Sequence, residues 1–199
     1  MATDTNHWLP VINGALYKIG LPPSQDINDV TWGGVERFES TAKQVFRTFP
    51  WGFAQKYVDL AVSPSMKPAF GWEYGHSFPA DYLRVIDVHT NMDLRSHKCR
   101  YCIANGGIYT NVDPCYLRYV AYIADTEKWP LDFADAVSAL LAAHLAPLNA
   151  QTQAMTPSLI QLYQLSLTQA QNSDATETTE RVPLDEDIYM ARMGARTQG

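Results

Sequence analysis

The hydrophobic pattern of this chain changes period at Trp51, and no other feature limits the possible folds as strongly. Before Trp51, apolar side chains recur at helical spacing and Pro50 ends the helix; this stripe consists of Val35, Phe38, Ala42, Val45, Phe46 and Phe49. After Phe53, and again in residues 83–88, apolar and polar residues alternate, which predicts β-strands with at least one stretch covered on both faces. We therefore expect an α+β fold in which a small β module is inserted between helices.

Helices are predicted on both sides of this module. Residues 8–19 form the first, which Gly20 ends, and the second spans about residues 29–49. Thr156 and Pro157 supply an N-cap and a first-turn proline for the fourth, which runs through Ala170. The third begins near Pro130, ends or kinks at Pro147, and carries the strongest periodicity on one face, which holds Phe133, Val137, Leu140, Leu141, His144, Leu145 and Leu148.

These patterns predict two structural parts followed by a C-terminal segment. Residues 1–52 and 125–175 are expected to form a mostly antiparallel bundle of about four helices. Residues 53–124 are expected to form the inserted antiparallel β module. Within it, Asn105 and Gly106 predict a hairpin turn between strands at residues 99–104 and 108–112, and a further strand is predicted at residues 117–124.

The composition changes at Asn172. Residues 172–180 are almost wholly Ser, Thr, Asp, Glu and Ala, which cannot bury enough apolar area to offset the entropy of ordering. We therefore expect residues 176–199 to be an extended arm that is flexible until it binds a partner. Its apolar cluster at Ile188, Tyr189 and Met190 fits either a partner surface or a segment that folds back onto its own domain.

Charge and cysteine content exclude several classes of function. The formal net charge is −6, so the chain lacks the basic field that proteins use to hold nucleic acid tightly. The N-terminus shows no basic segment followed by an apolar core, and the apolar run at residues 136–148 is too short to span a bilayer. Three cysteines are an odd number, which argues for reduced thiols. We expect a soluble cytoplasmic protein with no membrane partner.

No catalytic or cofactor motif is present in the sequence, so we predict neither an enzyme nor a cofactor. Asp81, Asp87 and His89 could suggest an acid–base group, as could Asp135 with His144. We interpret Asp81 as a turn acceptor and His144 as a hydrogen-bonded core histidine instead.

The sequence around residue 100 offers two further candidates. His97, Cys99, Cys102 and Cys115 have the ligand types of a zinc site, but its second half is only Cys115, and packed thiols fit the pattern better. A basic patch of Arg95, His97, Lys98 and Arg100 is either a solvated hairpin face or a contact for an acidic neighbouring subunit or for DNA phosphate.

The order of several short motifs resembles the tail tubular protein A family, the head-to-tail adaptors of short-tailed, T7-like bacteriophages. The resemblance covers the chain to about Ala175. Its motifs are residues 13–23 (NGALYKIGLPP), 51–54 (WGFA), Gly71 and Trp72, 78–85 (FPADYLRV), Trp129, 133–136 (FADA), the alanine-rich helix to Ala146 and the helix at residues 161–175.

The resemblance implies a structural protein of the virion. Family members form a dodecameric ring in the neck, between the portal ring and the tail nozzle (tail tubular protein B), and double-stranded DNA passes through the lumen during genome ejection without sequence recognition. The C-terminal arm would dock on the portal, for which we name Pro183, Ile188, Tyr189, Met190 and Arg192. The ring would assemble in the host cytoplasm, and the third helix with exposed aromatic residues would supply apolar contacts between neighbours.

Three points stay open at this stage. Attachment of tail fibres is neither predicted nor excluded. One alternative function is a head-completion or connector protein of another class of tailed phage. The other is a small zinc-binding module built on the cysteines.

Overall fold

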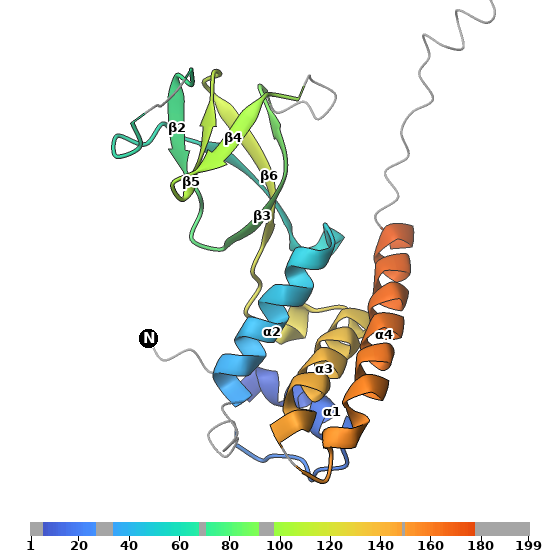
Figure 1. Cartoon of the computed structure of the whole chain (residues 1–199). Helices are drawn as coiled ribbons and strands as arrows, with labels where there is room; N and C mark the ends of the chain where they lie inside the picture. The colour runs from blue at the N-terminus through green and yellow to red at the C-terminus, as the bar shows by residue number, and fades with distance from the viewer. Residues whose placement is uncertain (1–5, 27–33, 68–70, 92–97, 149, 178–199) are drawn as a thin grey trace, which may run out of the picture.

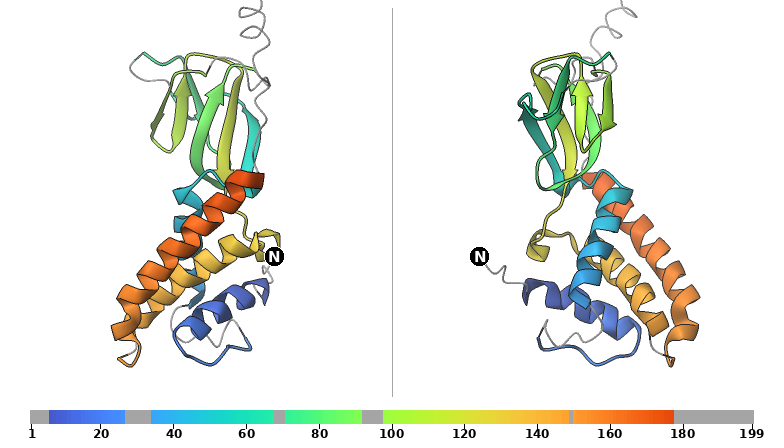
Figure 2. Two further views of the ribbon diagram at one scale, coloured as in Figure 1. Left: turned by 90° about the vertical axis from the view of Figure 1, so that its right-hand side faces the viewer. Right: turned by 60° about the vertical axis from the view of Figure 1, so that its left-hand side comes forward.

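The computed structural model describes residues 6–26, 34–67, 71–91, 98–148 and 150–177. Over these ranges the fold is α+β, with four α-helices and two small antiparallel sheets. The helices gather at one end of the molecule and both sheets at the other (Figure 1). Two rotated views show the same separation (Figure 2), so the protein is elongated.

The other three helices pack around α3. This helix contacts α1, α2 and α4, and Gly14 of α1 comes so close that a Cβ built on it would lie 3.4 Å from Cβ of Ser138. The predicted start of the second helix, at residue 29, lies outside the described residues. The helices are α1 (Leu9–Lys18), which follows a 3-10 turn η1 (Asn6–Trp8), α2 (Gly34–Thr48), α3 (Leu131–Leu145) and α4 (Thr156–Glu177).

The periodic face predicted on the third helix is buried in α3 at Phe133, Val137, Leu141 and Leu145, but burial extends beyond that face because three helices surround α3. Small residues away from the predicted face, such as Ala136, Ala139 and Ala143, are also buried. Conversely, Leu148, which was assigned to that face, follows the end of α3 and is 48% exposed. The periodicity of large apolar residues does not predict which alanines are buried. Alanine is buried where two helices approach closely, and that approach depends on tertiary packing.

The stretch Leu131–Leu148, which includes α3, is also long and apolar enough to cross a membrane by length and composition, with a mean hydropathy of 1.3. More than half of that stretch, 56%, is buried inside the protein, as in the core helix of a folded domain.

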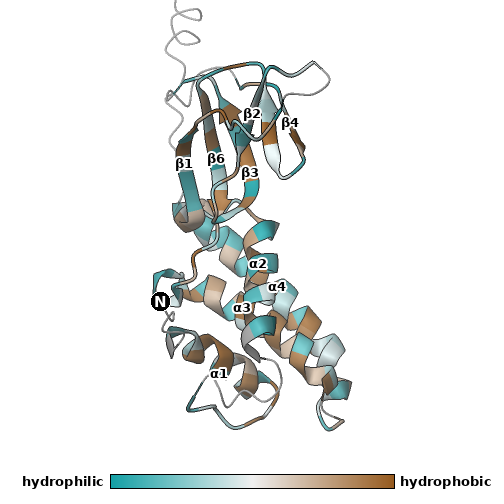
Figure 3. Ribbon diagram, turned by 90° about the vertical axis from the view of Figure 1, so that its left-hand side faces the viewer, coloured by the Kyte–Doolittle hydropathy of each residue, from teal (hydrophilic) through white to brown (hydrophobic). Residues whose placement is uncertain are grey.

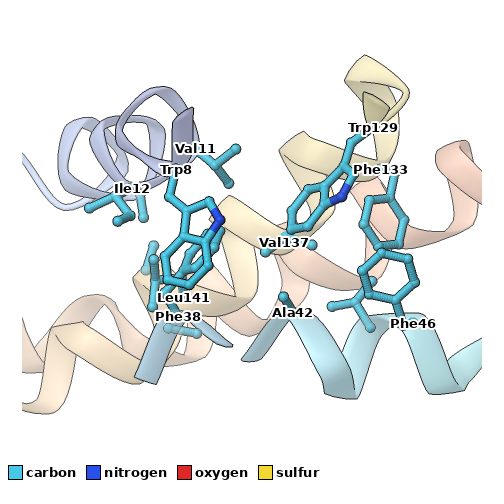
Figure 4. Packing of buried hydrophobic residues seen from close by; sticks show 14 of the residues in the cluster. Trp8, Val11, Ile12, Phe38, Ala42, Phe46, Trp129, Phe133, Val137 and Leu141 are labelled. Atoms are coloured by element: carbon cyan, nitrogen blue, oxygen red, sulfur yellow. The ribbon is translucent and has the colours of Figure 1, made fainter. Parts of the chain in front are cut away.

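The main core is aromatic and lies between α1, α2 and α3. Phe46 and Phe133 rings lie 4.7 Å apart between centroids, and Trp8 and Phe38 lie 5.0 Å apart. Figure 4 shows these side chains pointing toward one another from their three elements. The predicted apolar stripe of α2 is confirmed at Phe38, Ala42, Val45 and Phe46, which are fully buried.

The strands form two three-stranded sheets with the orders β1–β6–β3 and β2–β5–β4. Isolated bridges pair Val62, just after β1, with His76 of β2, and His89 of β3 with Lys98, ahead of β4. These bridges connect the two sheets at both sides, so the six strands surround a second core that includes Leu60, Val88, Ile108 and Leu117. The strands are β1 (Gln55–Leu60), β2 (Tyr74–Ser77), β3 (Tyr82–His89), β4 (Tyr101–Ala104), β5 (Gly107–Thr110) and β6 (Cys115–Ala121).

Local signals predicted the hairpin well and the end of β6 poorly. Asn105 and Gly106 both have positive φ, 49° and 74°, as the predicted β4–β5 turn requires. β6 ends at Ala121 instead of residue 124, because the carbonyls of Ile123 and Ala124 accept hydrogen bonds from tryptophan side chains.

Arginine side chains join α2 to β3, and tryptophan side chains bond to the backbone near the segments that connect helices and strands. Arg47 of α2 donates to the carbonyl of Leu83 in β3 at 2.6 Å, and Arg84 donates to the carbonyl of Arg47 at 3.2 Å. Three indole N–H groups donate to backbone carbonyls near the two crossings between helices and strands: Trp8 to Ala124 (2.8 Å), Trp51 to Val45 (3.0 Å) and Trp129 to Ile123 (2.9 Å). Because Arg47 lies in α2 while Leu83 and Arg84 lie in β3, the arginine bonds hold the two ends of the molecule in one orientation, and the indole bonds order the connecting segments.

α4 continues past the composition change at Asn172. Both carboxylate oxygens of Asp174 accept from the backbone N–H of Gly52, at 2.8 and 3.0 Å. Ser173 Oγ donates to Asp132 Oδ2 at 2.6 Å. The prediction that this polar segment does not order was therefore wrong for residues 172–177, because polar tertiary contacts, rather than apolar burial, hold them in the helix.

Candidate functional site

On the outer face of the first sheet, the structure brings together Asp87, His89 and Lys98. His89 Nε2 lies 3.1 Å from Asp87 Oδ1, although the pair lacks the alignment of a hydrogen bond, and Lys98 Nζ lies 3.8 Å from Asp87 Oδ2. The side chains of Asp87 and His89 are only 10% and 5% exposed. The covered stretch that alternation predicted in β3 is confirmed here, where residues 87–89 are all buried.

Arg118 completes this cluster and was missed by the sequence analysis. Its register in β6 places it between Tyr57 of β1 and Asp87 of β3. Arg118 donates twice to Gln55 Oε1, at 2.9 and 2.6 Å, stacks over the Tyr57 ring at 5.6 Å, and lies 3.9 Å from Asp87 Oδ2. Strand register was the missing information, since these partners are more than 25 residues apart in the chain.

A pocket of about 390 Å³ lies beside the cluster, between β1, β6 and the end of β3. Tyr57, Tyr116 and His89 are among its lining residues. Within the cluster, Lys98, Arg118 and His89 surround the one buried carboxylate of Asp87, which is the compensation that a buried anion needs. The arrangement therefore fits a structural role for Asp87 and His89.

The predicted basic patch is described only in part. Lys98 and Arg100 are exposed, while Arg95 and His97 lie outside the described residues. Lys98 faces Asp87, so part of the positive charge in this patch is balanced within the same molecule. Whether the patch meets a subunit or DNA stays a prediction.

The cysteines are distributed over both sheets. Cys102 lies in β4 of the second sheet, whereas Cys115 lies in β6 of the first. Burial, with added repulsion from Cys99, Asp59 and Asp113, raises the pKa of the Cys115 thiol to about 12. Among the described residues, no group of three or more His, Cys, Asp or Glu side chains is arranged to hold a metal ion.

Asp81 stands in the turn before β3, as expected, but its carboxylate binds outside that turn. Lys56 Nζ lies 2.6 Å from Oδ2, and Tyr119 donates to Oδ1 at 3.0 Å. Burial acts to raise the pKa of Asp81, but these two hydrogen bonds outweigh it and lower the pKa below its usual value. Asp81 therefore joins β1 and β6 beneath the start of β3.

The other candidate pair is separated in the structure. Asp135 binds Lys18 Nζ at 2.7 Å and Ser166 Oγ at 2.8 Å, while His144 Nδ1 lies 3.0 Å from Thr41 Oγ1. Burial, with the nearby charge of Arg37, lowers the pKa of His144. The interpretation of His144 as a hydrogen-bonded core histidine is confirmed for the hydrogen bond, but the residue is half-buried between α2 and α3 and not in the core.

The apolar surface expected on the third helix is on α4 instead. α3 is covered by its three neighbours, so the expectation that it supplies contacts between copies was wrong. α4 covers one side of α3 and leaves its other side open, with Leu165 71% exposed. Figure 3 shows hydrophobic residues interspersed along α4. The arm residues named for portal binding, Pro183, Ile188, Tyr189, Met190 and Arg192, lie outside the described residues.

Comparison with models of known protein families and with curated proteins gives no match to this chain. We therefore infer the function of this chain from its residues and their geometry.

Proposed function

We propose that this protein is a structural protein of a virion, the head-to-tail adaptor of a short-tailed bacteriophage, similar to the tail tubular protein A family. Copies of the chain form a dodecameric ring between the portal and the tail nozzle, and the ring completes the channel for DNA. In this proposal the protein performs no bond-making chemistry. It acts through surfaces that bind copies of itself and two neighbouring rings.

The separation of the two ends of the molecule carries this proposal. Helices occupy one end and sheets the other, so the chain offers two structurally different ends (Figure 1). An adaptor needs such surfaces in a constant relative orientation. The hydrogen bonds of Arg47 with Leu83, which join the two ends, support that requirement, as do those of Asp174 with Gly52, which hold α4 to the segment that leads into the strands.

We interpret the helical end as a bundle made of residues 1–52 and 125–175, with residues 53–124 as a module inserted into it. The chain passes from α2 into the strands through Pro50–Ala54 and returns through residues 122–130. The bridges Val62–His76 and His89–Lys98 support a separate module, because they link the two sheets to each other. The C-terminal arm then begins after Glu177, where α4 ends.

Electrostatics also support a conduit for DNA. With a formal net charge of −6, the protein repels phosphate on average. A wall of that sign lets a duplex pass without being held.

The test is reconstitution with the portal ring of the same phage. Native mass spectrometry of the mixture should show adaptor copies bound to portal rings, and the triple substitution Ile188→Ala, Tyr189→Ala and Met190→Ala should abolish the complex. Replacing Thr178, Thr179 and Glu180 by alanine is the matched control within the same arm and should leave binding intact. Failure of the wild-type protein to associate with portal rings would contradict the adaptor function.

A further inference from the structure

α4 exposes a face of an unusual kind for a surface helix. Ile160, Leu162 and Leu165 are 44%, 37% and 71% exposed, and the exposed amides of Gln161, Gln164 and, one turn further on, Gln169 lie beside them. We refer to these six residues as the α4 face. The opposite side of the helix packs on α3 through Leu159, Ser166 and Ala170.

The α4 face carries no charge. From Ala136 to Ser173 the sequence contains no Asp, Glu, Lys or Arg. An exposed helix face usually carries charged side chains, as α2 does along Glu36, Glu39, Lys43 and Arg47. Depletion of charge together with exposed leucine and isoleucine distinguishes the centre of a protein interface from ordinary surface.

Charge also indicates which partner fits this face. Two copies of a chain with a net charge of −6 repel each other wherever their acidic surfaces meet, so a neutral face is where they can approach. Glutamine amides both donate and accept, so this face can bond to another neutral polar surface of the same chain. A nucleic acid or a strongly charged protein would instead select a face of opposite charge.

We propose that the α4 face is a contact surface between copies of this chain. The inference deepens the adaptor function and rests on it, because a ring requires each copy to bind its neighbour. The α4 face extends over residues 160–169, a helix segment about 15 Å long and about 10 Å wide, so it offers only about 150 Å². A stable interface needs about 800 Å² per partner, so free copies associate weakly and the portal ring is needed to hold them together.

Photo-crosslinking of the full-length protein, without portal, tests this contact. Benzoylphenylalanine placed at Gln164 should give covalent products between copies at high protein concentration. The same group at Gln44, which is exposed on the charged side of α2, is the matched control and should give none. Adding Leu165→Glu should lower the yield from position 164 by about tenfold or more, since it places an unpaired charge in a contact that is otherwise uncharged. Ile103→Glu, at an exposed site on β4, should leave the yield unchanged.

The outcomes separate this inference from the adaptor function. Equal yields from positions 164 and 44 would overturn the contact. So would a yield that Leu165→Glu leaves unchanged, provided that the variant melts at the wild-type temperature. Products that extend to trimers and beyond would support both proposals, because a ring requires contacts that do not close in pairs. Products that stop at dimers would support the contact and count against the ring. Binding to portal by a protein whose crosslinking is insensitive to Leu165→Glu would support the adaptor function and reject this surface.

Discussion

Replacing Asp174 by alanine is expected to lower the free energy of unfolding by about 2 kcal/mol. Asp174 is 8% exposed, and its carboxylate accepts the Gly52 N–H with both oxygens, at 2.8 and 3.0 Å. A hydrogen bond to a charged group contributes about 1.5–3 kcal/mol, and a buried donor left without its acceptor costs about 1–3 kcal/mol. A pocket of about 320 Å³ beside Trp51 and Asp174 lets water replace part of the lost bond, which places the expected value near the middle of these ranges.

This loss is measurable in two ways. For a chain of 199 residues, about 2 kcal/mol corresponds to a fall of about 4–8 °C in melting temperature. Hydrogen exchange should also show faster exchange of the Gly52 amide, because that N–H is the donor to Asp174. Calorimetry and exchange together distinguish loss of this bond from general weakening of the fold.

Two variants serve as controls. Asp174→Asn keeps an oxygen acceptor without the charge and should cost about 1 kcal/mol. Asp132→Ala removes the acceptor of the Ser173 hydroxyl in a half-buried position and should cost less than about 1 kcal/mol. If Asp174→Ala melts within about 1 °C of the wild type, or if Gly52 keeps its protection, then Asp174 does not hold α4 to the start of the strands.

Three more predictions follow from the same contacts. Deleting residues 178–199 should leave the melting temperature unchanged, whereas deleting residues 172–199 should lower it, because only the longer deletion removes Asp174. Burial raises the pKa of Asp135, but the bonds from Lys18 and Ser166 outweigh it and lower that pKa below 3.8. The stability from these bonds is present above pH 3.8 and is lost as the pH falls through the folded-state pKa. The difference in melting temperature between the wild type and Asp135→Asn should therefore shrink below about pH 4. Gly14→Val should cost about 1–3 kcal/mol in denaturant unfolding, because its methyl groups would overlap Ser138.

Each of these predictions has its own control. Equal melting temperatures for the two deletions would show that the last turn of α4 adds nothing. A difference between wild type and Asp135→Asn that stays constant with pH would reject the role given to its hydrogen bonds. Gly14→Ala should stay within about 1 kcal/mol of the wild type, because gain in helix propensity offsets the tight contact. A neutral effect of Gly14→Val would show that α1 and α3 are not closely packed there.

Short-range signals in the sequence were enough to predict the helices and several of their ends. Proline and glycine fix backbone angles locally, which is why the start of α4 at Thr156 and the β4–β5 turn at Asn105 were predicted correctly. The stripe on α2 could also be predicted, since one apolar face packs against one core.

The residues that meet at the candidate sites were harder to predict from the sequence. The cluster at Asp87 depends on Arg118, which reaches it only through the register of β3 against β6. Periodicity identifies which way a side chain points in a strand, but it does not identify the residue opposite it. Asp135 and His144 looked like a pair in the sequence, yet they bind different helices.

The sequence alone therefore determined the class of the fold, the change from helix to strand at Trp51 and the acidic net charge, because each depends on composition or on neighbours a few residues apart. Only the tertiary structure decided that α3 is covered by three helices, that Asp174 extends α4 past Asn172, and that α4 presents the open face. These features depend on contacts between residues far apart in the chain, such as Gly52 and Asp174, and no local pattern encodes which distant surface an element meets.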